Sequence, residues 1–348
     1  MAPLTQKTHN DYSVAILCAL ALERDAVRYM LDEEHQRLRT QPGDPNSYVL
    51  GRLHDHNVVL ACLPSQQGKG AAATVATNMS RSFPLVKWRL FVGIGGGVPS
   101  DRHPIRLGDV VISMPYGEYG GVVQYDLGRE TNSGFELKGF LWPPPAILRN
   151  AAQDMQSDHR VQSNKIEDYL EVMLTKWPRL VDYKQPSMPD VLFDESYPHV
   201  PDAPTCDGHC DLSHTIDRPA RELSGPIIHY GLIASGDSVV KNPEIRDRIA
   251  RSAGRDALCF EMEAAGLMTE FPAIVIRGIS DYADSHKNHD WQHYAAATAA
   301  ACAKELLSYV DPEQPPRYET SASSNVFTGQ GIQNTGSVNI GNDFNVSG

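Results

Sequence analysis

The segment from Cys259 to Asp284 constrains the fold of this chain more than any other. Its apolar run Phe271–Ile276 has the length and composition of a buried strand, and Ser280 and Asp281 follow where that strand is expected to end. In open α/β sheets, ligands bind beyond the carboxyl ends of the strands. A serine and an aspartate at this point are therefore well placed for chemistry.

Two glutamates lie shortly before this strand, in the sequence EMEAAG. Glu261 and Glu263 precede the small residues at 264–266 and could supply further carboxylates to the same site. The alternative is that both are solvated residues in the first turn of a helix, where the positive end of the helix dipole favours carboxylates. The residues alone leave both interpretations open.

Other segments have the pattern of a mostly parallel α/β sheet. Near-continuous apolar runs, which predict central strands, occur at Tyr12–Leu20, Leu90–Ile94 and Ile227–Ser235. The spacing of apolar residues predicts a helix over Ala21–Leu31, with Glu23 in its first turn, and a long Ala-rich helix over His289–Val310. We therefore expect an α/β fold.

A glycine-rich turn, Gly93 to Val98, ends the second of these runs. Such a turn lets backbone amides approach a ligand closely. Val98 stands where the pattern G-x-G-x-x-G requires its last glycine, so the turn does not indicate a dinucleotide site.

EMEAAG followed by RGISDYAD resembles the C-terminal half of the active site of the nucleoside phosphorylase and nucleosidase superfamily. The similarity is greatest to the branch that contains methylthioadenosine/S-adenosylhomocysteine nucleosidase. ILCALALERDAV near the N-terminus and GLIASGD at 231–237 are similar to other motifs of that family. The resemblance covers residues 12–310 and implies a single three-layer domain, with a central mixed, twisted sheet flanked by helices.

The resemblance also implies roles for the acidic residues in cleaving the N-glycosidic bond of a purine nucleoside or nucleotide. Asp281 would protonate the departing base at N7 as a general acid. Glu263 would lie near the ribose hydroxyls and stabilise the oxocarbenium-like centre. Glu23 would activate water, although a dipole-favoured first-turn residue is again the alternative. Glu261 would be a structural partner at the edge of the substrate site.

Further substrate contacts follow from the same motifs. The residues expected to border the sugar and the base are Gly95, Gly96, Ile233, Ser235, Gly236, Asp237, Phe260, Met262 and Ser280. Phosphorylases of the superfamily resemble one another in a G-D-P-x-R turn, whose arginine binds phosphate. Here the turn is CALALE and the first arginine is Arg24, so we expect hydrolysis.

The substrate is expected to be an adenine nucleoside or nucleotide, with ATP or dATP favoured. GGVVQYD at 120–126 is similar to an immune-receptor-associated branch of the superfamily, which includes nucleosidases acting on these nucleotides. A triphosphate needs several Arg or Lys side chains. The candidates are Lys69, Arg106, Lys241 and Arg246. For Lys69, a solvated lysine in a turn is the alternative.

Composition limits the partners. A net charge of −12 argues against non-specific binding to nucleic acid or to an anionic membrane. No apolar stretch approaches the ~18 residues of a membrane span, and the first residues are too polar for a signal peptide. We expect a cytoplasmic protein that binds a small purine compound and forms a homo-oligomer.

The six cysteines are scattered, and several lie in apolar runs where reduced, buried thiols are usual. Cys206 and Cys210, with His199 and His214 nearby, have a spacing found in structural zinc sites. Because no second ligand pair with standard spacing is present, we expect no metal and no cofactor.

We expect a flexible N-terminus at 1–11, a catalytic domain at 12–310 with an insertion at about 131–224, and a tail at 311–348. From Ser321 to Gly348 the tail interleaves Asn, Gly, Gln and Ser with single apolar residues, so it cannot fold alone. It resembles sigma-type amyloid-signalling motifs and could pair with an immune receptor. The alternative is a disordered tail without a role.

The sequence therefore predicts a purine nucleosidase, in immune or cell-death signalling. A methylthioadenosine/S-adenosylhomocysteine-type nucleosidase and a purine nucleoside phosphorylase are alternatives within the superfamily. A non-catalytic, nucleotide-sensing scaffold that acts through its tail is a third.

Overall fold

The structure, a computed structural model, describes residues 7–64, 68–132, 134–203, 205–221, 225–252 and 257–312. The first six residues of the expected N-terminal segment and residues 313–348 of the expected tail lie outside these ranges. Residues His9–Asp11 form a 3-10 turn.

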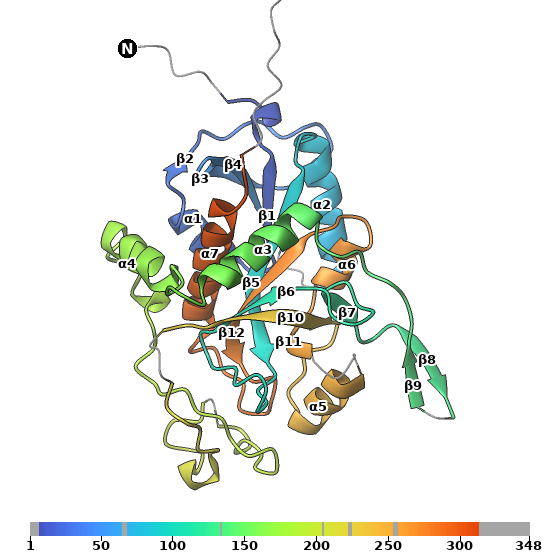
Figure 1. The fold of residues 1–348 in the computed structure, drawn as a ribbon, viewed down its shortest axis with the longest axis vertical. Coiled ribbons are helices and arrows are strands. Elements are labelled where there is room, and N and C mark those ends of the chain that lie inside the picture. Colours follow the sequence, from blue (N-terminus) through green and yellow to red (C-terminus); the bar gives the residue numbers. More distant parts are fainter. Residues whose placement is uncertain are drawn as a thin grey trace, which may run out of the picture. The chain divides into compact units, whose positions relative to one another are not determined.

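A mixed, ten-stranded sheet forms the centre of the domain (Figure 1). Its strands are β1 Val14–Cys18, β2 Glu33–Glu34, β3 Tyr48–Leu53, β4 His56–Cys62, β5 Trp88–Gly97, β6 Val110–Ser113, β7 Val122–Gln124, β10 Ile228–Ser235, β11 Ala257–Glu261 and β12 Ile274–Asp281. They are ordered β11-β10-β6-β12-β5-β1-β4-β3-β2, and β7 pairs with β10. β11 also pairs with β5, so β11, β10, β6, β12 and β5 close into a ring.

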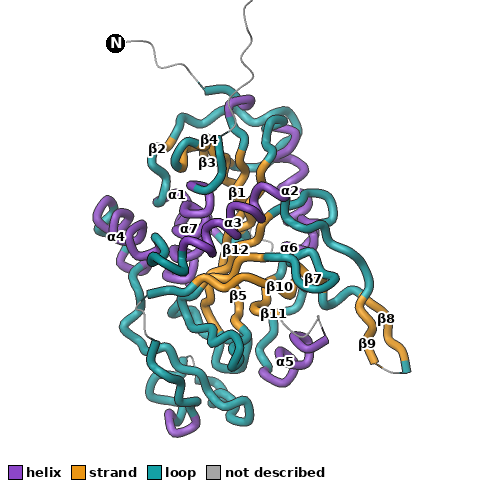
Figure 2. Tube along the Cα trace, viewed as in Figure 1, coloured by secondary structure: helices purple, strands orange, loops and turns teal. Residues whose placement is uncertain are grey.

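Helices cover both faces of the sheet, as Figure 2 shows. They are α1 Ala21–Tyr29, α2 Lys69–Ser82, α3 Ala146–Asp158, α4 Ile166–Lys176, α5 Pro243–Ser252, α6 Ala264–Met268 and α7 Gln292–Ser308. Side chains alternate along β1: Val14 and Ile16 belong to the core cluster that includes residues of α1, α3, α4 and α7, whereas Ala15 and Leu17 belong to the cluster that includes residues of α2 and α6. The expected three-layer α/β architecture is therefore confirmed.

The region from 131 to 224 contains regular structure as well as irregular segments. It holds part of a two-stranded hairpin, β8 Gly128–Thr131 and β9 Gly134–Leu137, as well as α3, α4 and the 3-10 turns η2 Val181–Tyr183 and η3 Leu212–His214. α3 and α4 pack against α7, so this half of the region belongs to the layer on one face of the sheet.

β12 and β5 are the central pair for the site. β12 runs parallel to β5 and antiparallel to β6, and all eight of its residues are buried. α7 packs directly on β12 at Gly278, where a Cβ atom would lie 1.8 Å from the carbonyl oxygen of Ala295. Among the described residues, no helix is long and apolar enough to cross a membrane.

Candidate active site

One cavity of about 290 Å³ gathers the ends of β5, β11 and β12 and the turn after β1. Ten of the predicted residues line it: Glu23, Gly95, Gly96, Lys241, Phe260, Glu261, Met262, Glu263, Ser280 and Asp281. The expected position beyond the carboxyl ends of the strands is therefore where these side chains meet.

Arg277, on β12, is the charge around which three glutamates are arranged. Its guanidinium is fully buried, donates to Glu261 Oε2 at 2.6 Å, and lies 4.0 Å from Glu23 Oε1 and 3.9 Å from Glu263 Oε2. It also stacks over the Phe91 ring at 4.2 Å. Removing any one of these side chains would leave a buried charge without its partner, which is costly, so the guanidinium and the carboxylates hold one another in place.

Glu23 is held by backbone groups on both sides. The N–H groups of Ala19 and Leu20 each donate to its Oε2 at 2.8 Å, and the Ile94 N–H donates to its Oε1 at 2.8 Å. Burial raises the pKa of this carboxyl, against the lowering effect of Arg277 and of the three amides. The result is a fixed carboxylate of increased basicity at the cavity wall, because desolvation disfavours its charged form.

Glu261 and Glu263 differ in how many partners they have. Glu261 accepts from Arg277, from the Glu263 N–H at 3.1 Å and from the Ala264 N–H at 2.9 Å. Burial, followed by the neighbouring charge of Glu261, raises the pKa of Glu263 to about 7. Glu261 is therefore occupied in holding the start of α6, whereas the Glu263 carboxyl accepts a backbone hydrogen bond from Gly68 and lines the cavity.

Asp281 lies at the end of β12 and lines the same cavity as the glutamates. Its Oδ2 accepts from Ser280 Oγ at 2.8 Å and pairs with Lys287 Nζ at 3.0 Å, while its Oδ1 accepts from the Ala283 N–H at 2.9 Å. Gly96 of β5 is paired with Phe260 on one side and Asp281 on the other. The glycine-rich segment was expected to be a turn, but Gly93 to Gly97 are strand residues of β5, and Gly95 and Gly96 line the cavity from that strand.

Four residues expected to contact substrate support the site instead of lining this cavity. Ile233 is a fully buried core residue, and Ser235 Oγ accepts from the Ala265 N–H at 2.9 Å. Gly236 packs against the ring of Tyr125. The Asp237 carboxylate accepts from the Lys69 N–H and pairs with Lys69 Nζ at 3.2 Å.

The four basic residues expected to bind phosphates also differ in whether they line the cavity. Lys69 is committed to Asp126 and Asp237, at 2.8 and 3.2 Å. The Arg106 guanidinium donates to the Pro219 carbonyl.

Arg246 was expected to bind phosphates, and the structure corrects this expectation. Its buried guanidinium donates to the Tyr282 carbonyl at 3.0 Å and to Asp247 at 2.6 Å. It therefore holds the turn that follows Asp281. Of the four, Lys241 lines the cavity.

Sequence reasoning missed several lining or supporting residues. Lys287, His289 and Gln292 line the cavity from the segment that follows β12, and Val239 and Val240 line it beside Lys241. Arg277 could have been found from the sequence, because a single arginine inside an apolar run needs a buried acidic partner. The others lie in segments whose path depends on the fold.

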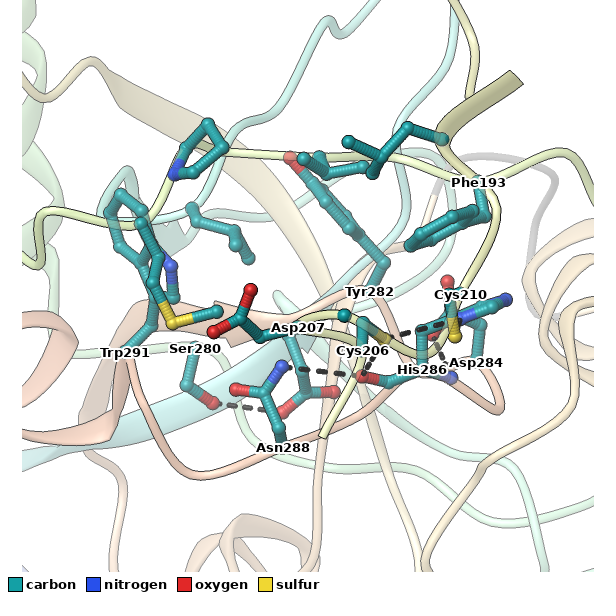
Figure 3. A pocket seen from close by; sticks show the side chains of 17 residues that line it. Phe193, Cys206, Asp207, Cys210, Ser280, Tyr282, Asp284, His286, Asn288 and Trp291 are labelled. Carbon is teal, nitrogen blue, oxygen red and sulfur yellow. Dashed lines mark hydrogen bonds between the residues drawn. The ribbon is translucent and has the colours of Figure 1, made fainter. Parts of the chain in front are cut away.

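A second cavity of about 380 Å³ meets the first at Ser280 and Asp281 (Figure 3). Apolar and aromatic side chains, including Phe193, Tyr282 and Trp291, form much of its wall. It is bordered by the irregular segment 188–212, which the sequence placed in an insertion near the site.

Comparisons with known proteins found relatives of this chain. Over 306 residues, the chain is 40% identical to a nucleotide-binding leucine-rich repeat (NLR)-like protein of Hyaloscypha variabilis. These residues make up 87% of this chain and 30% of that protein. It is 33% identical to the ATP nucleosidase Cap17 of Escherichia coli over 91 residues, 25% of this chain and 18% of the relative. The chain thus spans less than a third of the length of these two relatives.

The fold is also that of solved structures. The 5'-methylthioadenosine/S-adenosylhomocysteine nucleosidase of Neisseria meningitidis, in complex with methylthio-immucillin-A, superimposes with a TM-score of 0.54 at 20% identity, covering 86% of this chain and 99% of that one. Residues 13–310 match the family described as the phosphorylase superfamily. Because this match extends over most of the 348 residues, the chain belongs to the phosphorylase superfamily.

Proposed function

We propose that this protein is a nucleosidase that hydrolyses the N-glycosidic bond of an adenine nucleoside or nucleotide and releases the free base. The observation that carries the proposal is that one cavity is lined by the carboxyl groups of Glu23, Glu263 and Asp281. Glu23 and Glu263, beside Arg277, lie on one part of its wall, and Asp281 lies at the end of β12. Cleavage of this bond needs acidic groups at both the sugar and the base.

Asp281 is proposed to protonate N7 of the purine as the bond to the anomeric carbon breaks. The Ala283 N–H and Ser280 Oγ fix the orientation of its carboxyl group. The bonding electron pair leaves with the base, which the added proton makes neutral. Ser280 and the Ala283 backbone are positioning groups for this step.

Glu263 and Glu23 are proposed to act at the sugar. The Glu263 carboxylate accepts hydrogen bonds from ribose hydroxyls and stabilises the positive charge that develops on the ring. Glu23 takes a proton from water as the water oxygen bonds to the anomeric carbon. The raised pKa of Glu23 favours this acceptance, because a more basic carboxylate takes a proton more readily.

Hydrolysis is proposed over phosphorolysis because of the turn after β1. The backbone amides of Ala19 and Leu20, which could otherwise bind an anion, both donate to Glu23. The neighbouring Arg24 is paired with Asp25 at 2.7 Å. This turn therefore presents a carboxylate, which repels phosphate, to the cavity.

For the substrate we favour ATP or dATP, in an immune or cell-death setting. The names of the NLR-like and Cap17 relatives support this choice. Lys241 is exposed on the cavity wall, where it offers positive charge for phosphates. A methylthioadenosine-type substrate is the alternative, supported by the likeness to the Neisseria enzyme's fold.

The proposed location, oligomeric state and receptor partner rest on the sequence. A cytoplasmic homo-oligomer with an immune-receptor partner at the tail fits the tail's composition. A non-catalytic scaffold is disfavoured, because binding alone would not require Glu23, Glu263 and Asp281 in one cavity.

The proposal is tested by incubating the full chain with ATP, dATP, AMP, adenosine and methylthioadenosine, with and without phosphate, and separating the products by chromatography. We expect free adenine and a sugar with a free anomeric hydroxyl, at a rate that added phosphate does not raise. A ribose 1-phosphate product would make the protein a phosphorylase, and no base from any substrate would support the scaffold.

Lys241→Ala tests the triphosphate assignment. Removing its charge should raise KM for ATP about tenfold or more and leave KM for adenosine nearly unchanged, because only ATP presents phosphates to it. Lys138→Ala, an exposed lysine on the wall of a different cavity, is the matched control. Equal effects on both substrates would remove Lys241 from phosphate binding.

A further inference from the structure

A cluster of two thiols and two imidazoles lies beside the second cavity. The side chains of His199, Cys206, Cys210 and His286 bring one ligand atom each to within 4.8 Å of one another. Cys206 and Cys210 come from the irregular segment near the site, and His286 comes from the segment after β12, 76 residues beyond Cys210. Figure 3 shows Cys206, Cys210 and His286 together beside Phe193.

The two rings present the same nitrogen to the sulfurs. His199 Nε2 faces the Ala203 carbonyl at 3.0 Å, and His286 Nε2 faces the Tyr197 carbonyl at 2.9 Å. A ring nitrogen that faces a carbonyl carries the hydrogen, so Nδ1 of each neutral ring has a free lone pair. Backbone carbonyls that orient histidines in this way are the usual outer partners of zinc-bound imidazoles.

The distances between the two sulfurs and the two Nδ1 atoms suit a single shared metal ion. Cys206 Sγ lies 3.5 and 3.4 Å from Nδ1 of His199 and His286, and Cys210 Sγ lies 3.2 and 3.7 Å from the same two atoms. Tetrahedral zinc with its usual Zn–S and Zn–N bond lengths requires S···N separations of about 3.5 Å. Two S–H hydrogens can serve only two of the four contacts, whereas one ion serves all four.

We propose that these four residues bind a structural zinc ion. The set of two thiolates and two imidazoles suits tetrahedral Zn²⁺ and fills all four positions, so the ion would have no open site for chemistry. The sequence argument against a metal rested on the absence of a second ligand pair near the cysteines. The fold supplies His286 from the segment after β12, whereas His214, the other histidine noted near the cysteines, stacks on Tyr197.

The ion would tie the insertion to the segment that carries the proposed acid. His286 lies between Asp284, which accepts from the His286 N–H at 2.9 Å, and Lys287, which pairs with Asp281. The Phe193 ring stacks on the His286 ring at 3.9 Å between centroids. Zinc would therefore hold the wall of the second cavity against the turn after β12, and this role does not depend on the proposed reaction.

The first experiment measures metal in the full chain, purified without added chelator. We expect about one zinc ion per chain by mass spectrometry. Replacement by Co²⁺ should give the visible absorption of a tetrahedral site with sulfur-to-cobalt charge transfer. A wild-type protein that neither contains zinc nor takes up Zn²⁺ or Co²⁺ after reduction would overturn the proposal, as would a Cys206–Cys210 disulfide as its only stable form.

Variants then identify the ligands. Cys206→Ser with Cys210→Ser should reduce zinc content at least tenfold. Cys62→Ser, a half-buried thiol in β4, and His214→Ala, a ring stacked on Tyr197 beside the cluster, should leave it unchanged.

If the double variant fails to fold, His286→Cys gives an independent reading. A third thiolate should keep the ion and increase the sulfur-to-cobalt absorption. Full zinc content in the folded double variant, or an unaltered cobalt spectrum in the histidine variant, would assign the metal elsewhere.

Discussion

At the scale of single residues, the cavity is a balance between one buried guanidinium and three buried carboxyl groups. Arg277 is shared among Glu23, Glu261 and Glu263, so its charge cannot fully compensate all of them. The remaining cost of burial raises the pKa of both Glu23 and Glu263. Perturbed acids in one cavity are typical of sites that move protons.

Asp281→Asn should fold normally and lose base release by about 10²–10⁴-fold, because an amide cannot donate the proton that the purine needs. The Ala283 N–H and Ser280 Oγ can still hydrogen-bond to the asparagine. Initial rates of adenine release, with circular dichroism as the folding control, measure the effect. Activity within a factor of two of wild type would exclude Asp281 from the mechanism.

Glu263 should make the protein less stable as the pH rises from about 4.5 to about 7. The folded protein keeps the proton up to a pKa of about 7, compared with a usual value of 4.5, so it binds more protons than the unfolded chain in this range.

Glu263→Gln removes this penalty. Relative to wild type, the variant should gain stability between pH 5 and pH 8, by at most about 3 kcal/mol, since one pKa unit corresponds to about 1.4 kcal/mol. Urea unfolding at both pH values measures the difference. A constant difference between variant and wild type would show that Glu263 titrates normally.

At the scale of elements, the site depends on how closely β5 and β12 approach the charged cluster. Gly93 of β5 is paired with Arg277 of β12, and a Cβ atom at Gly93 would lie 2.2 Å from the Arg277 guanidinium and 2.5 Å from Glu23 Oε1. Both of these side chains are buried and fixed by partners. The pairing of the two strands thus creates the space that the network fills.

Gly93→Ala should therefore destabilise the protein by about 1–3 kcal/mol, the usual cost of an overpacked interior, and should reduce activity more than tenfold by displacing Arg277 and Glu23. Gly70→Ala, in the first turn of α2 with nothing within 4 Å of the added atom, is the matched control and should be neutral or slightly stabilising. Equal stability and activity of the two variants would contradict the packing argument.

At the scale of the whole molecule, one α/β domain contains every acidic group of the proposed reaction. The candidate zinc ligands join its insertion to the same active-site segment. The part of the tail from 313 onward lies outside the described residues, so its proposed role rests on composition. From 321 to 348 it contains Asp343 as its one ionisable side chain.

A peptide spanning 321–348 should form fibrils with cross-β diffraction. Its alternation of Gly with Asn or Gln and with isolated apolar residues lets identical copies stack ~4.8 Å apart with little charge repulsion. Ile332→Asp with Ile340→Asp should block fibril formation, since each stacked layer would add two charges, and deletion of the tail should leave base release unchanged. A peptide that stays monomeric at high concentration, even when seeded, would make the tail a linker.

The sequence by itself determined the fold class, because buried apolar runs are local patterns, and its resemblance to the superfamily indicated the acidic residues of the site. The buried runs at β1, β5, β10 and β12 each required a strand, and short motifs at their ends kept Glu23, Glu263 and Asp281 at fixed distances along the chain from those strands. The supporting role expected for Glu261 came from the same resemblance. Such signals do not depend on residues distant in the sequence.

Only the tertiary structure decided which charges face the cavity. Lys69, Arg106 and Arg246 lie near the site in sequence, yet their partners Asp126, Pro219 and Tyr282 come from other segments. The meeting of Cys206 and Cys210 with His286 likewise depends on the path of the insertion. These contacts join residues far apart in the chain and form only when the chain packs. Composition and motif spacing therefore do not predict them.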